Sequence, residues 1–121
     1  MVILICGSRF YTDYAKIYDY LKRLNPSRVI AGGCRGADAL AVRAAKALGV
    51  PFREFPADWG KFGKAAGPMR NQQMLDEGGP DLVLAFHGNL EESKGTKDMV
   101  HRAIDQGIPL WLIGAERSVL T

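Results

Sequence analysis

Short apolar runs and amphipathic segments alternate along the chain. The apolar runs predict strands, and the run Leu82–Phe86 is continuous enough to suit a strand that helices cover on both faces. The predicted strands are Val2–Cys6, Arg28–Ala31, Phe52–Phe55, Leu82–Phe86 and Leu110–Ile113. Because strands alternate with helices from end to end, the pattern predicts a parallel sheet.

Four helices are expected between these strands, since apolar stripes recur at helical spacing and the segment ends carry residues typical of helix boundaries. They cover Asp13–Leu24 with Thr12 as the N-cap, Ala37–Leu48, a segment that opens around Pro68 and breaks at Gly78 and Gly79, and a segment that Thr96 caps and that ends near Gln106. The stretch Pro56–Gly67 is expected to be irregular, and loops of this length are often functional.

The order of these elements predicts the fold class. Right-handed crossovers between parallel strands give a doubly wound, three-layer α/β sandwich with a five-stranded, mainly parallel sheet. A chain of 121 residues suits a single domain, 1–121. Ligands of such folds bind outside the carboxyl ends of the strands. The residues that follow each strand are therefore the first place to look for function.

Composition narrows the class of protein. The hydrophobic share of 47% is ordinary for a globular protein. No apolar run approaches the ~20 residues that span a bilayer, so no membrane partner is expected. Apolar residues follow Met1 without a basic leader, and we therefore expect a cytoplasmic protein. Cys6 and Cys34 lack a metal-type spacing, which favours small buried or pocket-edge thiols over a disulfide and gives no reason to expect a metal or another cofactor.

The turn after the second predicted strand is the strongest chemical signal. It reads Gly32-Gly33-Cys34-Arg35-Gly36-Ala37-Asp38 and joins an apolar run to an alanine-rich helix. Glycines let backbone amides approach an anion, and the following helix adds unpaired amides and the positive end of its dipole. The plain alternative is a tight strand-to-helix turn that needs glycine for its dihedral angles alone.

Two further turns strengthen the phosphate hypothesis. Gly7-Ser8-Arg9 follows the first strand, and the loop that starts at His87 ends in Gly95-Thr96 at a helix start. All three turns lie at one edge of a parallel sheet, so together they predict one anion-binding crevice. An ordinary N-cap explains Gly95 and Thr96 equally well when they are taken alone. The net charge of +3 would help to attract nucleotides or a nucleic-acid backbone.

Five motifs, taken in order, resemble a known family. They are Gly7-Ser8-Arg9, the glycine turn at 32–38, Ala57-Asp58-Trp59, Ala66-Gly67-Pro68-Met69-Arg70-Asn71 and Lys94-Gly95-Thr96-Lys97-Asp98-Met99. Together they resemble the YspA-type branch of the SLOG superfamily, whose relatives include the Lonely Guy and DprA proteins. The resemblance covers nearly the whole chain. It implies a Rossmann-like fold that binds a nucleotide or a nucleotide-derived ligand, as a sensor or a scavenging protein, and it implies a homodimer.

The turns and the resemblance together define the candidate ligand-binding residues. They are Gly7, Ser8, Arg9, Gly32, Gly33, Arg35, Asp38, Asp58, Trp59, Arg70, Asn71, Gly95 and Thr96. Asp58 and Trp59 would position a ribose hydroxyl and stack on a base, although Trp59 can equally anchor the long loop against the core. Asp38 would orient Arg35 or contact a ribose, although an acid in a first helical turn is also favourable through the dipole alone.

The relatives imply two alternative functions. The Lonely Guy branch is similar at Gly95-Thr96 and implies a nucleoside 5′-monophosphate phosphoribohydrolase. In that case Arg70 and Asp98 are the candidate catalytic residues, because Met99 stands at the place of the branch's glutamate and N-glycosidic cleavage needs a carboxylate. DprA has a glycine-rich turn similar to 32–38 and implies single-stranded DNA binding, with Trp59, Phe62 and Phe10 as stacking residues.

Overall fold

The apolar runs of the chain pair side by side in one parallel sheet. The computed structural model describes residues 1–88 and 93–114, and within them the sheet has five strands in the order β3-β2-β1-β4-β5. The strands are β1 (Val2–Gly7), β2 (Arg28–Ala31), β3 (Phe52–Glu54), β4 (Leu82–His87) and β5 (Leu110–Gly114). Each neighbouring pair is parallel. The predicted α/β fold is therefore confirmed.

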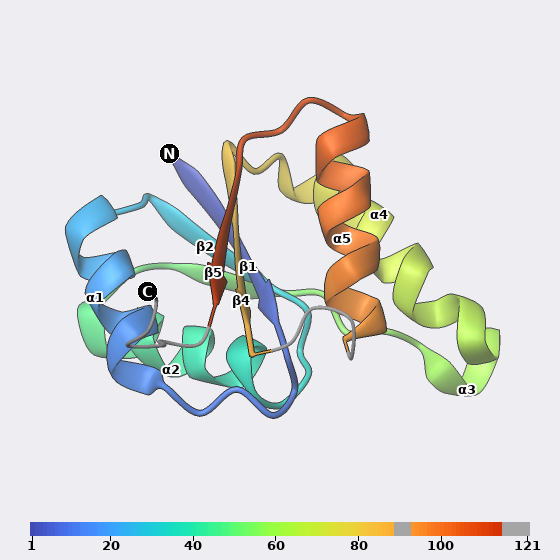
Figure 1. Ribbon diagram of the computed structural model, residues 1–121, viewed down its shortest axis with the longest axis horizontal. Coiled ribbons are helices and arrows are strands. Elements are labelled where there is room, and N and C mark those ends of the chain that lie inside the picture. Colours follow the sequence, from blue (N-terminus) through green and yellow to red (C-terminus); the bar gives the residue numbers. More distant parts are fainter. Residues whose placement is uncertain (89–92, 115–121) are drawn as a thin grey trace, which may run out of the picture.

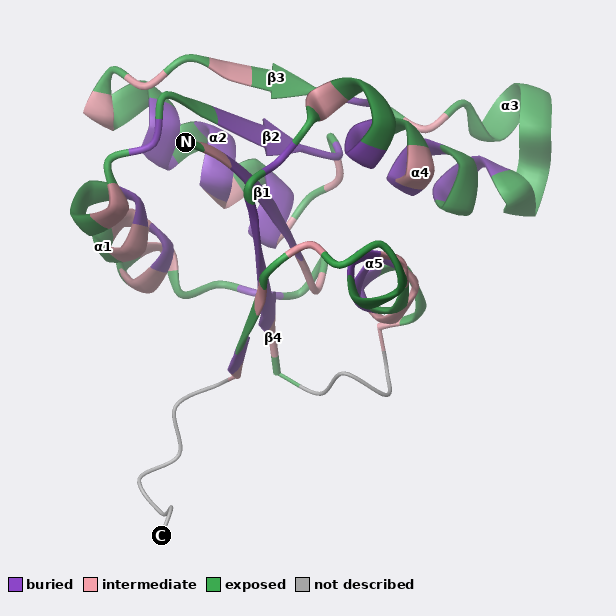
Figure 2. Cartoon of the chain, turned by 90° about the horizontal axis from the view of Figure 1, so that it is seen from above, coloured by how far each residue is buried: buried purple, intermediate pink, exposed green. Residues whose placement is uncertain are grey.

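Helices cover both faces of the sheet, as Figure 2 shows. α1 (Tyr14–Leu24) and α2 (Ala37–Leu48) pack on one face, and α4 (Ala66–Gly78) and α5 (Lys94–Asp105) pack on the other. Side chains of a strand alternate between the faces, so Ile3 and Ile5 of β1 join the core under α1 and α2. Leu4 joins the core under α4 and α5. This two-sided burial explains why the central strands read as continuous apolar runs.

The direction in which the sheet grows reverses at β1. The chain first builds outward from β1 through β2 to β3, and it then returns to place β4 and β5 on the other side of β1. Gly7 at the end of β1 lies level with Phe86 of β4. The loops after these two strands lead to opposite faces of the sheet. Doubly wound folds bind their ligands at such a switch point.

Two predicted helix caps are wrong. Asp13 caps α1 in place of Thr12, because the Asp13 carboxylate accepts a hydrogen bond from the Lys16 amide over 3.1 Å. α5 begins two residues before Thr96, with Ser93 at the N-cap position. At α1 two neighbouring residues can cap the helix, and the Asp13 side chain does so. At α5 the Ser93 side chain makes no capping hydrogen bond, because its hydroxyl donates to the Thr96 hydroxyl.

The stretch expected to be irregular, Pro56–Gly67, contains regular structure. It includes α3 (Trp59–Phe62), a 3-10 turn at Gly63–Ala65 and the start of α4. Figure 1 shows that α3 projects away from the sheet. A four-residue helix is too short to display an apolar period, so the sequence pattern gave no signal for it. Within the described ranges, no helix combines the length and the apolar character that a membrane span needs.

Ser8 fastens the β1–α1 loop to the rest of the fold. Its amide donates to the Phe86 carbonyl over 3.0 Å, and its carbonyl accepts from the amides of Tyr11 and Ala37, each over 3.1 Å. The bond from Ala37 brings the loop against the start of α2. A Cβ added at Gly36 would lie 2.3 Å from the Ser8 carbonyl oxygen. Only glycine leaves room for this contact.

Gly36→Ala tests whether this contact is as tight as the geometry indicates. Gly36 and Gly63 share a backbone conformation that strongly favours glycine, with φ and ψ of +77° and −131° at Gly36 and of +56° and −133° at Gly63. A Cβ at Gly63 meets nothing within 4 Å. Both alanine variants incur the cost of that backbone, and only Gly36→Ala adds a steric clash. We expect urea denaturation to show an extra loss of about 1–3 kcal/mol for Gly36→Ala. Equal losses in the two variants would contradict the tight packing of the loops.

Candidate functional site at the carboxyl edge of the sheet

Two of the three candidate turns are in direct contact. A Cβ at Gly7 would lie 2.1 Å from the Phe86 carbonyl oxygen and 2.7 Å from the Ala37 side chain. The backbone of Arg9 lies against Gly36 in the same way, since a Cβ at Gly36 would be 2.4 Å from the Arg9 Cα. The turns after β1 and β2 therefore form one continuous surface, as the sequence predicted from the parallel sheet.

The N-terminus of α2 opens onto this surface. Gly36 is the N-cap residue of α2, and no side chain among the described residues caps the helix there. Gly33 and Arg35 are exposed, and Gly33 has a positive φ of +80°. The first turn of a helix holds amides without partners inside the helix, and its dipole favours negative charge. The arrangement suits an anion.

Asp38 is buried beside this turn, and its carboxylate bonds to the backbone of the turn. Its carboxylate accepts a hydrogen bond from the Cys34 amide over 3.2 Å, and it does not contact the Arg35 side chain in any described hydrogen bond or ion pair. Burial raises the pKa of Asp38 to about 6, although hydrogen bonds from the Cys34 and Gly32 amides and the nearby Arg70 charge oppose the rise. Asp38 therefore holds the backbone of the glycine turn in place.

Arg70 of α4 braces the same turn from the other side. The Arg70 side chain is only 8% exposed. Its Nη1 donates to the carbonyl oxygens of Gly32 and, over 3.3 Å, Phe55, and Nη2 lies 3.8 Å from the Cys34 sulfur. A Cβ at Gly32 would be 2.6 Å from Nη1. The guanidinium thus ties the end of β2 to the segment after β3, and it needs glycine at position 32 to do so.

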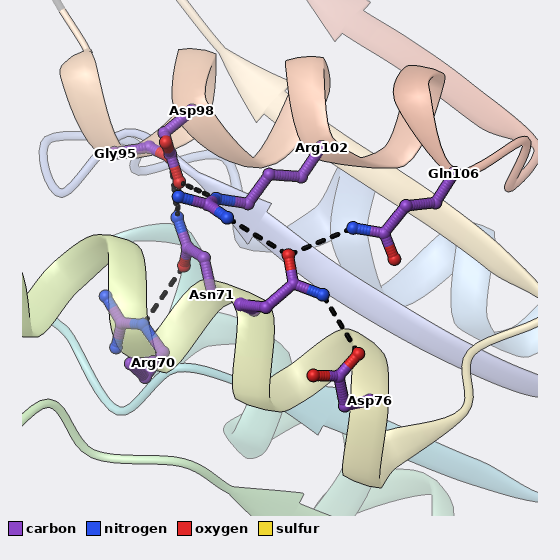
Figure 3. Close-up of polar contacts among 8 residues, drawn as sticks. Arg70, Asn71, Asp76, Gly95, Asp98, Arg102 and Gln106 are labelled. Carbon is purple, nitrogen blue, oxygen red and sulfur yellow. Dashed lines mark hydrogen bonds and ion pairs between the residues drawn. The ribbon is translucent and has the colours of Figure 1, made fainter.

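Asn71, the next residue of α4, reaches the start of α5 (Figure 3). Its Nδ2 donates to the Gly95 carbonyl over 3.2 Å and to Asp98 Oδ2 over 2.9 Å, and its Oδ1 accepts from Arg70 Nε over 3.1 Å. Asp98 Oδ2 also accepts from Arg102 Nε over 2.7 Å. The two candidate catalytic residues, Arg70 and Asp98, therefore share one network through Asn71.

This network continues along the interface between α4 and α5. Gln72 Oε1 accepts from Arg102 Nη1 and from Gln106 Nε2, each over 3.0 Å, and Gln72 Nε2 donates to Asp76 over 2.9 Å. The sequence analysis did not identify Gln72, Arg102 or Gln106. A signal was present in the four-residue spacing of Asp98, Arg102 and Gln106, which places them on one face of a helix.

The turn before α5 has a buried part and an open part. Thr96 is 3% exposed, and its hydroxyl accepts a hydrogen bond from the Ser93 hydroxyl over 2.6 Å. Gly95 is exposed, and a Cβ there would meet open space. Met99 is fully buried in the core under α4 and α5. Residues 89–92 of the predicted third loop lie outside the described residues.

Asp58 and Trp59 belong to a separate segment from the glycine turns, at the start of α3. The Asp58 carboxylate accepts from the Lys61 amide over 3.1 Å and caps the helix. The Trp59 ring packs near Gly67, where a Cβ would be 3.0 Å from its Cη2 atom, yet the residue stays 54% exposed. Both contacts are of the kind that would anchor the long loop after β3.

Cys6 and Cys34 are both free thiols. Cys6 is buried in β1, and burial raises its pKa well above the ordinary range, which makes it unreactive at neutral pH. Cys34 is partly exposed beside Arg70. Both cysteines are free thiols, as expected, with Cys6 buried and Cys34 at intermediate exposure. Among residues 1–88 and 93–114, no three His, Cys, Asp or Glu side chains are grouped to hold a metal ion.

The pKa of Asp38 predicts a dependence of stability on pH. A carboxyl group whose pKa is raised by folding stabilises the native state while protonated, and this contribution is lost as pH rises through the folded pKa. The Asp38 pKa is about 6 against 3.8 ordinarily. We expect the stability of the parent relative to Asp38→Asn to fall by about 2–3 kcal/mol from about pH 4 to about pH 7. Urea denaturation across this range measures it, and a constant difference would contradict the burial of a titrating carboxyl group.

Sequence comparison identifies the family. The profile of YAcAr, the YspA, cpYpsA-related SLOG family, matches residues 1–62. The Gene 61 protein of Mycobacterium phage D29 is 37% identical over 118 residues, which cover 89% of this chain and 92% of that protein. The fold is similar to that of DNA processing protein A (DprA) from Streptococcus pneumoniae, with a TM-score of 0.53 and 18% identity over 90% of this chain, and the chain spans 57% of that DprA chain. The chain belongs to the YspA, cpYpsA-related SLOG family.

Proposed function

We propose that the carboxyl edge of the sheet binds a nucleotide or a nucleotide-derived ligand, with a phosphate group against the turn at residues 33–36. The observation that supports this most strongly is the start of α2, where no side chain among the described residues caps the helix and only the Ala37 amide is taken up, by the Ser8 carbonyl. Exposed Arg35 comes from that turn, and exposed Arg9 comes from the turn that packs against it. Backbone amides and two guanidinium groups are the donors that phosphate oxygens require.

The contacts of the buried Asp38 and Arg70 side chains with the turn support the same proposal. Asp38 holds the Cys34 amide and Arg70 holds the Gly32 carbonyl, so the backbone of the turn is fixed before a ligand arrives. A site that is ordered in advance loses less conformational entropy on binding. In this account Arg70, Asp38 and Asn71 are positioning residues, while Gly33, Arg35 and Arg9 face the ligand. Gly95 would add an amide from the start of α5.

The biological role that fits such a site is a sensor or a scavenger of nucleotide-derived molecules. Such a role needs binding alone, and binding explains the glycine turns without requiring a reacting group. The family resemblance also implies a homodimer, which we retain as a proposal. Native mass spectrometry of the purified protein would report both the mass of a co-purifying nucleotide and the number of copies in the assembly.

Hydrolysis of a nucleoside monophosphate is the second candidate. Arg70 and Asp98 lie in one network, as that chemistry would need, but the geometry favours a supporting role for both. Asp98 Oδ2 already accepts hydrogen bonds from Asn71 and Arg102, and Arg70 is 8% exposed. The Met99 position is fully buried in the core and offers no group to a sugar. A thioether cannot stabilise positive charge on a ribose as a carboxylate does.

Single-stranded DNA is the third candidate, and the fold shared with DNA processing protein A is the reason to retain it. Phe10, Trp59 and Phe62 are exposed at 73%, 54% and 41% and would offer stacking surfaces. A net charge of +3 is modest for a groove that follows a nucleic-acid backbone. Binding of an oligonucleotide that persists at high salt and is not displaced by a mononucleotide would favour DNA over the proposal.

Arg35→Gln tests the proposed phosphate site. The loss of one charge-assisted contact is expected to weaken the binding of ribose 5-phosphate and AMP by about 1.5–3 kcal/mol, as measured by isothermal titration calorimetry. Arg28→Gln is the matched control, because Arg28 is also exposed but lies at the amino end of β2, at the opposite edge of the sheet. If the two variants bind alike, the phosphate does not lie at the turn.

The second test separates binding from hydrolysis. We expect incubation with AMP, GMP or CMP to release no more free base than a buffer control, because the Asp98 carboxylate already accepts hydrogen bonds from Asn71 and Arg102. Liquid chromatography of the mixture measures the release. Rapid release that Asp98→Asn abolishes would contradict the binding proposal and make Asp98 a catalytic residue.

A further inference from the structure

A depression of about 250 Å³ lies between α3 and α4, beyond the end of β3. One wall comes from the segment after β3 and from α3, and the other wall comes from α4. The side chains that define it are Pro56, Asp58 and Phe62 on the first wall and Met69, Arg70 and Gln73 on the second. Asp58 and Arg70 were both expected at a ligand site, but the sequence pattern does not indicate that the other four residues join them, because that contact depends on how α3 packs against α4.

The depression adjoins the glycine turn. Pro56 lines the depression, and its Cα lies 3.6 Å from the place where a Cβ of Gly33 would be. Arg70 belongs to both features, since it lines the depression and donates to the Gly32 carbonyl. A ligand whose phosphate lies against the turn can therefore extend directly into this depression without crossing another element.

The walls have the chemistry that a flat aromatic ring requires. Phe62 and Met69 are 41% and 46% exposed, so both side chains are accessible to a ligand. An aromatic face and a polarizable thioether both pack well against a planar ring. Gln73 is exposed, and its amide has no hydrogen-bond partner among the described residues. An amide offers both a donor and an acceptor to the polar edge of a heterocycle.

The size of the depression limits what it can hold. Sites for whole drug-sized ligands usually enclose about 300–1,000 Å³, and this depression has about 250 Å³. It therefore suits one ring system and leaves the remainder of a nucleotide outside. A larger depression of about 390 Å³ lies along α1, but among the described residues its lining comes from residues 13–23. A hollow with walls from one helix and its cap does not enclose a ligand.

We propose that the depression between α3 and α4 is a subsite for the base of a mononucleotide, with Phe62 and Met69 against the ring and Gln73 at its polar edge. The inference rests on the proposed phosphate site, because the turn at 33–36 fixes where the ligand enters. The ligand then spans two parts of the surface. The glycine turn holds the phosphate, and the depression distinguishes a nucleotide from other phosphate esters.

Isothermal titration calorimetry with four probes tests this proposal: ribose 5-phosphate, AMP, CMP and adenosine. The variants are Phe62→Ala and Gln73→Ala, and Leu112→Ala is the control because Leu112 is also an exposed apolar residue, at 51%, but lies on β5. All three side chains are exposed, so the variants are expected to fold, and thermal unfolding checks this. We expect Phe62→Ala to weaken the binding of at least one of the two mononucleotides about tenfold or more and to leave ribose 5-phosphate unchanged within about twofold.

The outcomes separate the two proposals. Equal binding of AMP and CMP by the parent and both variants, with ribose 5-phosphate still bound, overturns the base subsite and leaves the phosphate site intact. Binding of adenosine that depends on Phe62, without binding of ribose 5-phosphate, supports the subsite and overturns the phosphate site. If the parent binds no probe, both proposals fail. Phe62-dependent binding of an oligodeoxynucleotide but of no mononucleotide overturns the assigned ligand class in favour of single-stranded DNA.

Discussion

The buried guanidinium of Arg70 is the constraint on which the carboxyl edge depends. A charged group that leaves water loses several kcal/mol of solvation unless its donors find partners. Arg70 is 8% exposed, and it meets this requirement with two backbone carbonyls and the amide oxygen of Asn71. Those carbonyls belong to Gly32 and Phe55, which follow two neighbouring strands. The segments after β2 and β3 must therefore stay where the guanidinium can reach both.

The neighbouring side chain extends this constraint to the other half of the fold. Consecutive residues of a helix point about 100° apart, so Arg70 faces the ends of β2 and β3 while Asn71 faces α5. Asn71 holds the Gly95 carbonyl and Asp98. Two consecutive residues of α4 thus hold three segments in place: the one after β2, the one after β3 and the start of α5. In this account the glycines and the exposed arginines contact the ligand, while Arg70 and Asn71 keep the backbone of the turns in position.

Much of the fold could be predicted from the sequence. The apolar runs, the glycines after helices and the order of elements each report a local preference, and together they specify a parallel doubly wound sheet. The exceptions are equally physical. Thr12 and Asp13 both have side chains that can cap α1, and a local pattern cannot choose between neighbours. The helix at Trp59–Phe62 is shorter than two turns, so it has no period to detect.

The candidate site was harder to predict than the fold. Glycines at strand ends are visible as a motif, and the sequence correctly placed them at one edge. Arg70 was expected to face a ligand, because it matches a motif of the family and lies in the first turns of a helix after Pro68. Its burial depends on carbonyls 38 and 15 residues away in the chain, and no local pattern contains that information. The same holds for Phe62, Met69 and Gln73, which only the packing of α3 against α4 brings together.

The affinity of Arg70→Lys for AMP, measured by calorimetry, tests most directly whether the hydrogen bonds of the Arg70 guanidinium set the geometry of the binding site. A lysine keeps the charge but cannot reach two carbonyls with a planar fork. Arg53→Lys is the control, because Arg53 forms an ion pair with Glu77 over 3.3 Å in which both side chains are about half exposed. The account predicts that Arg70→Lys still unfolds cooperatively but binds AMP at least tenfold more weakly than Arg53→Lys. Equal affinities of the two variants would contradict it.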